Sequence, residues 1–276
     1  MARAVETRHH AQLAVDQPIC IYDLCTRLDV VVRFNNISME GMYDRFPRPR
    51  IHLSSVRPLG RRAFNCAHEL GHHLFGHGSK IDELRKEESR PVYADPREFI
   101  ADAFAGHLLM PTFAIGYAFT QRQISPSRAT RSQIYALACH FGVSYSALVT
   151  HLAYALREIP RDRVAELNKP LGRIRREILG YPEESPLIIA DEQWSSQTLD
   201  LEVGTLLLLP SNSAISGNVV RHEPNLVGYA LFRGARQGIG HAVFPSGKSV
   251  TLRVSRYQYV GLAQYRHLPD PDPDEE

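Results

Sequence analysis

Long apolar runs are missing from the 276-residue sequence, in which even the leucine stretch Leu206 to Leu209 has only four residues. A membrane helix needs about 20 predominantly apolar residues in succession, so we expect no membrane segment. Residues 1–18 carry several charges and no apolar core, which is unlike a secretory signal peptide. Both absences predict a cytoplasmic protein without a membrane partner.

Cysteine is also scarce. The sequence has four cysteines with no Cys-x-x-Cys spacing, namely Cys20, Cys25, Cys66 and Cys139. In a chain without an export signal, such cysteines are more simply interpreted as reduced thiols in the core. We therefore expect neither a disulfide framework nor a cysteine metal site.

An excess of charge of one sign is absent as well. Lysine and arginine number 32 against 30 aspartate and glutamate residues, which leaves a net charge of +2. This balance gives no ground for a nucleic-acid or membrane partner. The length is typical of about two domains, and 43% hydrophobic with 22% charged residues is an ordinary composition for a folded protein.

Hydrophobic spacing predicts a mixed N-terminal region. Apolar residues recur at helical intervals in some segments, and β-branched and aromatic residues cluster in others. Asp95 and Pro96 have the residue types of an N-cap and a first helical position. The expected elements are a helix in residues 19–28, strands at 30–34 and 50–55, and helices at 59–74 and from 96 to about 110.

Residues 127–156 have the pattern of two helices joined by a turn, with Ser144 placed to cap the second helix. In a DNA-binding helix-turn-helix, the second helix carries the side chains that reach bases and phosphates. The second segment here, residues 144–156, contains no arginine or lysine. We therefore predict a helical pair that packs on the rest of the fold.

From residue 187 the hydrophobic period becomes two. Short strand-like runs separated by Gly, Pro, Ser or Asn continue to about residue 268, which predicts a compact all-β module. The stretch before it, residues 159–186, is rich in arginine and keeps a helical spacing of apolar residues, so it is expected to be a partly helical connector.

The most informative segment runs from Phe64 to His72 and contains the pattern His-Glu-x-x-His. Two histidines four positions apart on a helix differ by about 40° in rotation and about 6 Å in height. The imidazoles of His68 and His72 therefore converge on one point, which suits a zinc ion. Glu69 lies about 100° round the helix, where its carboxylate can reach a metal-bound water as a general base without being a ligand.

A hydrolytic zinc site needs a third protein ligand and an open position. Glu98, near the start of the helix that follows Asp95, is the candidate if that helix returns antiparallel to the first. The same residues can instead form a capping box, and the local sequence leaves the two alternatives open. Asp102, one turn further on, would share the face of Glu98 and could accept the free ring N–H of a ligand histidine. The competing ligands are His73, His77, His107 and Asp82.

Further motifs surround these residues. They are Gly41-Met42-Tyr43, the strand Arg50 to Ser55, Arg62-Ala63-Phe64, Phe104-Ala105 after Asp102, Leu108-Leu109-Met110-Pro111 and Phe141-Gly142-Val143-Ser144. With the histidine motif they give residues 18–156 a pattern that resembles the ImmA/IrrE family of zinc-dependent endopeptidases. The family often has asparagine where Ser54 stands, and a histidine after the motif that here is shifted to His77.

The resemblance implies a zincin-like fold, the metal ligands His68, His72 and Glu98, and Glu69 as the catalytic carboxylate. For Glu98 it favours ligation over capping. Zn²⁺ is the expected cofactor, with manganese or iron as alternatives for two histidines and a carboxylate. A folded structure that placed the Glu98 carboxyl more than about 5 Å from the histidine pair would contradict this site.

A second donor for the oxyanion is also expected in such an enzyme. Tyr43 is the candidate because it follows Gly41 in the family-like stretch, and His52 is the next choice. The alternative for Tyr43 is a purely packing role in the core.

The predicted fold class is α+β, with a zincin-like N-terminal metallopeptidase domain, a helix-turn-helix-like pair and a separate C-terminal all-β module. In the metallopeptidase domain a small sheet supports the motif helix and the helix of Glu98. The predicted division is 1–126 for the metallopeptidase domain, 127–158 for the helical pair, 159–186 for the basic connector, 187–268 for the β-rich module and 269–276 for an acidic tail.

The first functional hypothesis is a cytoplasmic zinc endopeptidase. By resemblance, its substrate is a DNA-binding helix-turn-helix repressor that is cleaved under stress or on induction of a mobile element. Because the basic connector separates the β-rich module from the peptidase, we expect this module to gate or direct it. Two alternatives are a transcriptional regulator that binds DNA and has a structural zinc, and a module that sequesters the repressor without cutting it. Direct nucleic-acid binding is disfavoured by the uncharged second helix of the pair.

Overall fold

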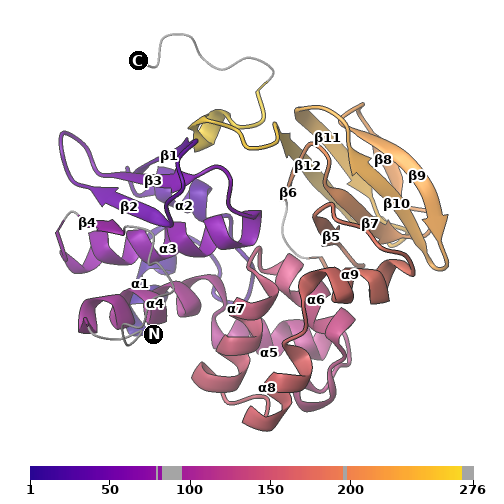
Figure 1. The fold of residues 1–276 in the computed structure, drawn as a ribbon, viewed down its shortest axis with the longest axis horizontal. Coiled ribbons are helices and arrows are strands. Elements are labelled where there is room, and N and C mark those ends of the chain that lie inside the picture. The colour runs from indigo at the N-terminus through magenta and orange to yellow at the C-terminus, as the bar shows by residue number, and fades with distance from the viewer. Residues whose placement is uncertain (79, 83–94, 195–197, 269–276) are drawn as a thin grey trace.

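A computed structural model describes residues 1–78, 80–82, 95–194 and 198–268 (Figure 1). Within these residues the strands form one five-stranded sheet and two four-stranded sheets. Helices pack beside the first sheet, and the other two sheets lie together further along the chain. The mixture of helices and sheets agrees with the predicted α+β class. The predicted acidic tail, 269–276, lies outside the described residues.

The five-stranded sheet has the strand order β13-β1-β3-β2-β4. Its β1 and β3 strands are parallel, and the other neighbours are antiparallel. Ile51 and Leu53 of β3 are buried, while Arg50 and His52, which alternate with them, are half-buried, so one face of the sheet is turned to the core. Helices α2 and α3 pack on that face. The strands are β1 (Val31–Asn35), β2 (Gly41–Asp44), β3 (Arg50–Ser54), β4 (Lys80–Asp82) and β13 (Gly261–Leu262).

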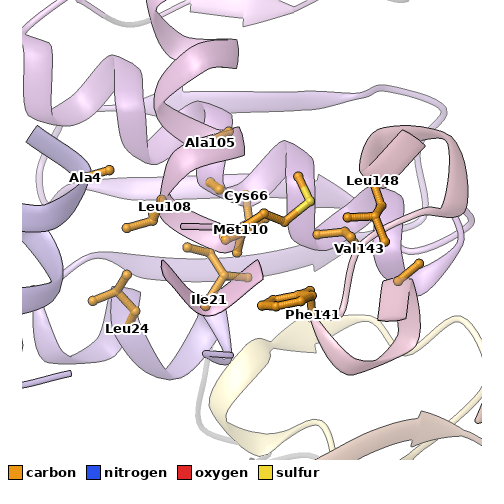
Figure 2. Packing of buried hydrophobic residues seen from close by; sticks show 14 of the residues in the cluster. Ala4, Ile21, Leu24, Cys66, Ala105, Leu108, Met110, Phe141, Val143 and Leu148 are labelled. Atoms are coloured by element: carbon orange, nitrogen blue, oxygen red, sulfur yellow. The ribbon is translucent and has the colours of Figure 1, made fainter. Parts of the chain in front are cut away.

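One apolar core joins this sheet to the helices (Figure 2). Leu24, Cys66 and Leu108 enter it from three helices of the N-terminal region, and Phe141 and Leu148 enter it from the helical pair. The pair therefore packs on the N-terminal region through a shared core. The helices are α1 (Ala2–His10), α2 (Ile21–Arg27), α3 (Leu59–Phe75), α4 (Pro96–Leu109), α5 (Thr112–Gln121), η1 (Pro126–Arg128), α6 (Arg131–His140), α7 (Tyr145–Thr150), η2 (His151–Ala155), α8 (Arg161–Leu167) and α9 (Leu171–Leu179).

Helices α4 and α5 together are long and apolar enough to cross a membrane, over Pro96–Gln121. Of the most apolar window in this segment, 56% is buried inside the fold, as in the core helices of folded proteins. The α6 and α7–η2 helices pass the same test only as a pair bent by 104°. The apolar character of these helices is accounted for by the shared core.

The two remaining sheets pack face to face as a sandwich. Their strand orders are β5-β7-β10-β9 and β6-β12-β11-β8. Side chains from both inner faces, such as Leu207 and Leu252, fill the space between the sheets. The strands are β5 (Leu187–Ile189), β6 (Thr198–Glu202), β7 (Leu206–Pro210), β8 (Ala214–Ser216), β9 (Val220–Leu226), β10 (Tyr229–Gly234), β11 (Gly238–Val243) and β12 (Ser249–Ser255).

The leucine run of β7 is buried on both sides. Leu207 and Leu209 face the second sheet of the sandwich. Leu206 and Leu208 face the opposite way, into a cluster with Leu179 at the end of α9. The continuous run arises because this strand lies between a sheet and helices, and a strand covered on both faces has no polar side.

The chain returns to the N-terminal sheet after the sandwich. Strand β13 pairs antiparallel with β1, and Tyr259 packs edge-on against the Phe34 ring, with ring centroids 6.3 Å apart. The sequence predicts that the β-rich module continues to about residue 268, so that residues 257–268 would belong to it. Only Gly261–Leu262 is a strand there, it belongs to the other sheet, and it is followed by the short helix η3 (Ala263–Tyr265). Local periodicity identifies a strand but not the sheet in which it pairs.

Candidate metal centre

Helix α3 places His68 and His72 on the same face, one turn apart. Its apolar residues Cys66, Ala67 and Leu70 are buried against the core. Gly76 ends the helix in the left-handed conformation with φ 67°, as is common for glycine at this position. The two imidazoles lie with their Nε2 atoms 3.0 Å apart. The convergence predicted from the four-residue spacing is therefore present.

Helix α4 contributes Glu98. The Asp95 side chain accepts a hydrogen bond from the Arg97 N–H and so caps the helix. Glu98 Oε2 lies 3.2 Å from His68 Nε2 and 3.5 Å from His72 Nε2, well within the 5 Å limit set from the sequence. Glu98 therefore points to the histidine pair.

The three side chains fit one metal ion. Tetrahedral zinc with bonds of about 2.0 to 2.1 Å requires ligand atoms about 3.3 Å apart. The separations of 3.0, 3.2 and 3.5 Å lie close to this value. The side chains are nearly buried, with exposed fractions of 9% for His68, 1% for His72 and 5% for Glu98. His68, His72 and Glu98 could therefore hold a metal ion.

Close packing of α3 on α4 gives this arrangement. A Cβ at Gly71 would lie 3.1 Å from Phe104 Cδ1 and 3.3 Å from Ala101 Cα. The glycine inside the motif thus lets the two helices approach at the level of the three ligand candidates. No local pattern indicates this contact, because it depends on the crossing of two helices.

The outer nitrogens of both histidines have partners. His68 Nδ1 lies 2.7 Å from Asp102 Oδ1, which is the contact suggested from the position of Asp102 on the face of Glu98. His72 Nδ1 lies 3.0 Å from His77 Nδ1. His77 was considered as a competing ligand, and the structure places it instead behind His72.

Glu69 is next to the histidine pair and buried, with an exposed fraction of 2%. Gly41, at the start of β2, lies against its carboxyl group. A Cβ on Gly41 would come within 2.7 Å of Glu69 Oε1 and 2.9 Å of its Cγ. The space for the Glu69 side chain therefore depends on the absence of a side chain at residue 41.

Tyr43 is buried on the same face of β2 as Gly41. Its hydroxyl lies 2.7 Å from Nδ1 of His73, the residue that follows His72 on α3. Burial lowers the pKa of His73, with Arg45 adding to the effect, so the ring is neutral and accepts the hydroxyl proton. His73, another competing ligand, is thus engaged with Tyr43.

The other candidates are His52, His107 and Asp82, and none of them belongs to the group of His68, His72 and Glu98. His52 alternates with Ile51 and Leu53 and so points to the face of the sheet opposite α3, where its Nδ1 contacts Asn35. His52, the second choice for the oxyanion donor, therefore points to the face of the sheet opposite Tyr43, because it pairs with Met42 and neighbouring strand residues point to opposite faces. His107 packs against the ring of His151. Asp82 belongs to the edge strand β4, whose backbone pairs with Gly41.

The cysteines of this region are free thiols. Cys66, two residues before His68, is fully buried with its Sγ 3.7 Å from Cys25 Sγ. Burial, together with the Cys25 contact, raises the pKa of the Cys66 thiol well above its usual range. These properties are those of a core thiol.

The second helix of the pair is turned inward. Tyr145, Leu148 and Val149 of α7 are buried, and His151 and Leu152 continue the buried face in η2. The Ser144 side chain caps the helix by accepting a hydrogen bond from the Ala147 N–H, as the sequence predicts. The exposed positions of α7 are Ser146 and Thr150, so the exposed side of this helix carries no arginine or lysine.

A buried cluster of two histidines and a carboxylate, beside a glutamate in a mixed helix and sheet region, is typical of metal-dependent hydrolases. Residues 25–152 match the family model for the IrrE N-terminal-like domain, Peptidase_M78. This part of the chain is therefore similar to the Peptidase_M78 family, in agreement with the resemblance that the sequence motifs indicate.

A solved structure, that of a Mycobacterium tuberculosis transcriptional regulator, is also similar. The identity is 19% and the TM-score 0.40, over 59% of this chain and 48% of that one. The chain thus spans about half the length of that regulator. No curated protein matches the sequence.

Proposed function

We propose that this protein is a zinc-dependent endopeptidase whose centre is formed by His68, His72, Glu98 and Glu69. The observation that carries the proposal is the convergence of two imidazoles and one carboxylate at separations of 3.0 to 3.5 Å, with Glu69 adjacent in the same helix. The match of residues 25–152 to a peptidase family supports it.

In the proposed mechanism His68, His72 and Glu98 hold the metal. When bound there, zinc would act as a Lewis acid that acidifies a water molecule and polarises a peptide carbonyl. Glu69 accepts the proton of the attacking water and passes it to the nitrogen of the leaving amine. Asp102 accepts the Nδ1 proton of His68 and so keeps its Nε2 free for the metal.

Tyr43 is the proposed second donor to the oxyanion. Its hydroxyl is 2.7 Å from His73 Nδ1, so this role requires that the hydrogen bond opens when a substrate carbonyl arrives. Burial also raises the pKa of Tyr43, so its hydroxyl stays protonated and able to donate.

The proposed substrate is a cytoplasmic protein, and by family resemblance a DNA-binding helix-turn-helix repressor involved in a stress response or mobile-element control. The alternative in which this chain itself binds DNA is opposed by the buried face of α7. The alternative of a non-cleaving module predicts that Glu69 has no effect on the fate of the repressor.

The test is metal analysis of the protein together with incubation against the repressor encoded next to its gene. We expect about one zinc per chain and cleavage by the wild type. Glu69→Gln removes the base but no ligand, so it should keep the metal and lose cleavage by at least about 100-fold. The exposed Glu184 gives the matched control Glu184→Gln, which should cleave normally. Equal cleavage by Glu69→Gln and wild type would contradict the mechanism, and binding without cleavage by the wild type would favour the sequestering alternative.

A further inference from the structure

We propose that His77 is a positioning residue that holds the proposed metal ligand His72 in its binding orientation. The inference rests on the proposed metal site and adds a residue to it. It starts from one contact, the 3.0 Å separation between Nδ1 of His77 and Nδ1 of His72.

The end of helix α3 brings His77 to this place. Gly76 adopts φ 67°, which turns the chain back toward the last helical turn. The His77 N–H then donates to the His72 carbonyl at 3.0 Å. The Phe75 ring stacks on the imidazole of His77, with centroids 5.6 Å apart and planes 18° apart. The backbone and the side chain of His77 are therefore both fixed relative to His72.

The tautomer that a metal-binding histidine requires determines which of the two imidazoles donates this hydrogen bond. The Nε2 atom of His72 faces Glu98 and His68, so it must present its lone pair to the metal and its proton must sit on Nδ1. That N–H donates to the unprotonated Nδ1 of His77, whose own proton is then on Nε2. The bond selects the tautomer of His72 that can bind metal and fixes the rotation of its ring.

The two ligand histidines are thus held by different partners. His68 has a carboxylate partner, Asp102, at 2.7 Å. His72 is almost fully buried and has an imidazole partner, that of His77, instead. A second carboxylate beside Glu98 and Glu69 would add negative charge to a buried site, whereas the unprotonated nitrogen of an imidazole can accept the hydrogen bond from the His72 N–H without adding a charge.

The test compares two substitutions of nearly equal shape in the full-length protein. Asparagine places an oxygen acceptor where His77 has Nδ1, and leucine places a methyl group there. We expect His77→Leu to weaken Zn²⁺ binding by about 10- to 100-fold, and His77→Asn to stay within about threefold of the wild type. The measurement is the dissociation constant for Zn²⁺ alone, obtained by competition with a chromophoric chelator.

Two controls separate positioning from folding. His241, an exposed histidine on β11, gives His241→Leu, which should bind Zn²⁺ as the wild type does. Urea unfolding of the metal-free proteins should give the same midpoint for His77→Leu and His77→Asn. Wild-type affinity in His77→Leu, or equal losses in the leucine and asparagine variants, would overturn the proposal.

Metal affinity also distinguishes this inference from the proposed function. A wild type that binds Zn²⁺ tightly but cleaves no protein would refute the peptidase and leave the role of His77 in place. A wild type without affinity for Zn²⁺ would refute both.

Discussion

At the scale of single residues, the proposed metal centre depends on a glycine, whose lack of a side chain leaves room for Glu69. Gly41 has no Cβ, and the carboxyl group of Glu69 occupies the space that a Cβ would need, with Oε1 at 2.7 Å. A contact under 3.0 Å cannot be accommodated without movement, and the nearest group is the proposed catalytic base. Gly41 therefore limits where the carboxyl group of Glu69, the proposed base, can lie.

We expect Gly41→Ala to lower peptidase turnover by about 100-fold, because a displacement of about 1 Å in a catalytic group can have an effect of that size. Metal content should stay near that of the wild type, since the added methyl group meets Glu69 and not a ligand. Both quantities are measured on the same preparation.

Gly116→Ala is the control for this substitution. Nothing lies within 4 Å of a Cβ at Gly116, and its φ is ordinary for a helix, so turnover should be unchanged. Normal turnover in Gly41→Ala would show that Glu69 can move without loss and would refute the positional requirement.

The sequence predicts most of the centre at this scale. The spacing of His68, Glu69 and His72 determines their directions on a helix, because helix geometry is independent of the rest of the fold. Glu98 needed the family resemblance, since its local sequence also suits a cap. Gly41 and His77 act through contacts that depend on the folded structure. Residue types and spacing do not indicate how closely β2 approaches α3, nor that the chain after α3 turns His77 back toward His72.

At the scale of elements, the contact between α6 and the sandwich contains a buried histidine. His140, at the end of α6, packs edge-on against Trp194 with ring centroids 5.4 Å apart. Burial, with a smaller effect of Arg122, lowers the pKa of His140 to about 3. The ring is therefore neutral in the folded protein at any pH near neutrality.

This histidine makes the stability of the protein depend on pH. Between pH 6.5 and about 3 the unfolded chain binds a proton at His140 that the folded chain does not, so stability falls as the pH falls. Each pH unit in this window corresponds to about 1.4 kcal/mol. We expect His140→Leu to reduce the loss of stability between pH 6.5 and pH 4.5 by about 2 to 3 kcal/mol.

The measurement is urea unfolding of wild type and His140→Leu at both pH values. The prediction concerns the change in the free energy of unfolding between the two pH values. Any effect of the substitution that is the same at both pH values therefore cancels. His151, whose pKa is lowered to about 4 by burial, remains in both proteins and has the same sign of effect. An equal pH dependence in both proteins would contradict the assignment.

Most elements of the N-terminal region could be predicted from local pattern. Helix α3 was expected at residues 59–74 and extends over Leu59–Phe75, and the strand expected at 50–55 is Arg50–Ser54. Residues 257–268 are predicted from the sequence as part of the β-rich module. They form a short strand at the edge of another sheet, since pairing partners are chosen by the tertiary fold.

At the scale of the whole molecule, the sandwich is joined to the N-terminal region by buried charges. Arg62 on α3 pairs with Glu202 at the end of β6, and both side chains are almost fully buried. Asp200 of β6 contacts Arg253 and Arg266. Burial alone would raise the pKa of Asp200, but the two arginines lower it to about 2, so the carboxylate stays charged. We expect the relative placement of the two regions to depend on these pairs.

Deletion of residues 257–276 tests how much the end of the chain stabilises the N-terminal region. The deletion keeps β5 to β12 but removes β13, the Tyr259 contact with Phe34, and Arg266 from Asp200. Loss of a buried aromatic side chain alone typically costs about 3 to 5 kcal/mol. We expect urea unfolding to show a loss of at least about 3 kcal/mol.

The control is a chain that lacks only residues 269–276, which should be as stable as the wild type because of the acidic, proline-rich composition of this segment. Unchanged stability after the longer deletion would show that β13 adds nothing to the first sheet. A deletion of the entire C-terminal part, from residue 185, removes β13 as well, so it changes the first sheet together with the sandwich.

The sequence by itself determined the helix with two histidines and a glutamate, the capped helix that carries Glu98, and the change to a β-rich region near residue 187. These features follow from spacing along the chain and from the geometry of single elements. Only the tertiary structure decided the contact of Gly41 with Glu69, the place of His77 behind His72, and the return of β13 to the first sheet. Each of these depends on how elements pack against one another or how the chain turns back on itself, and residue spacing does not encode that packing.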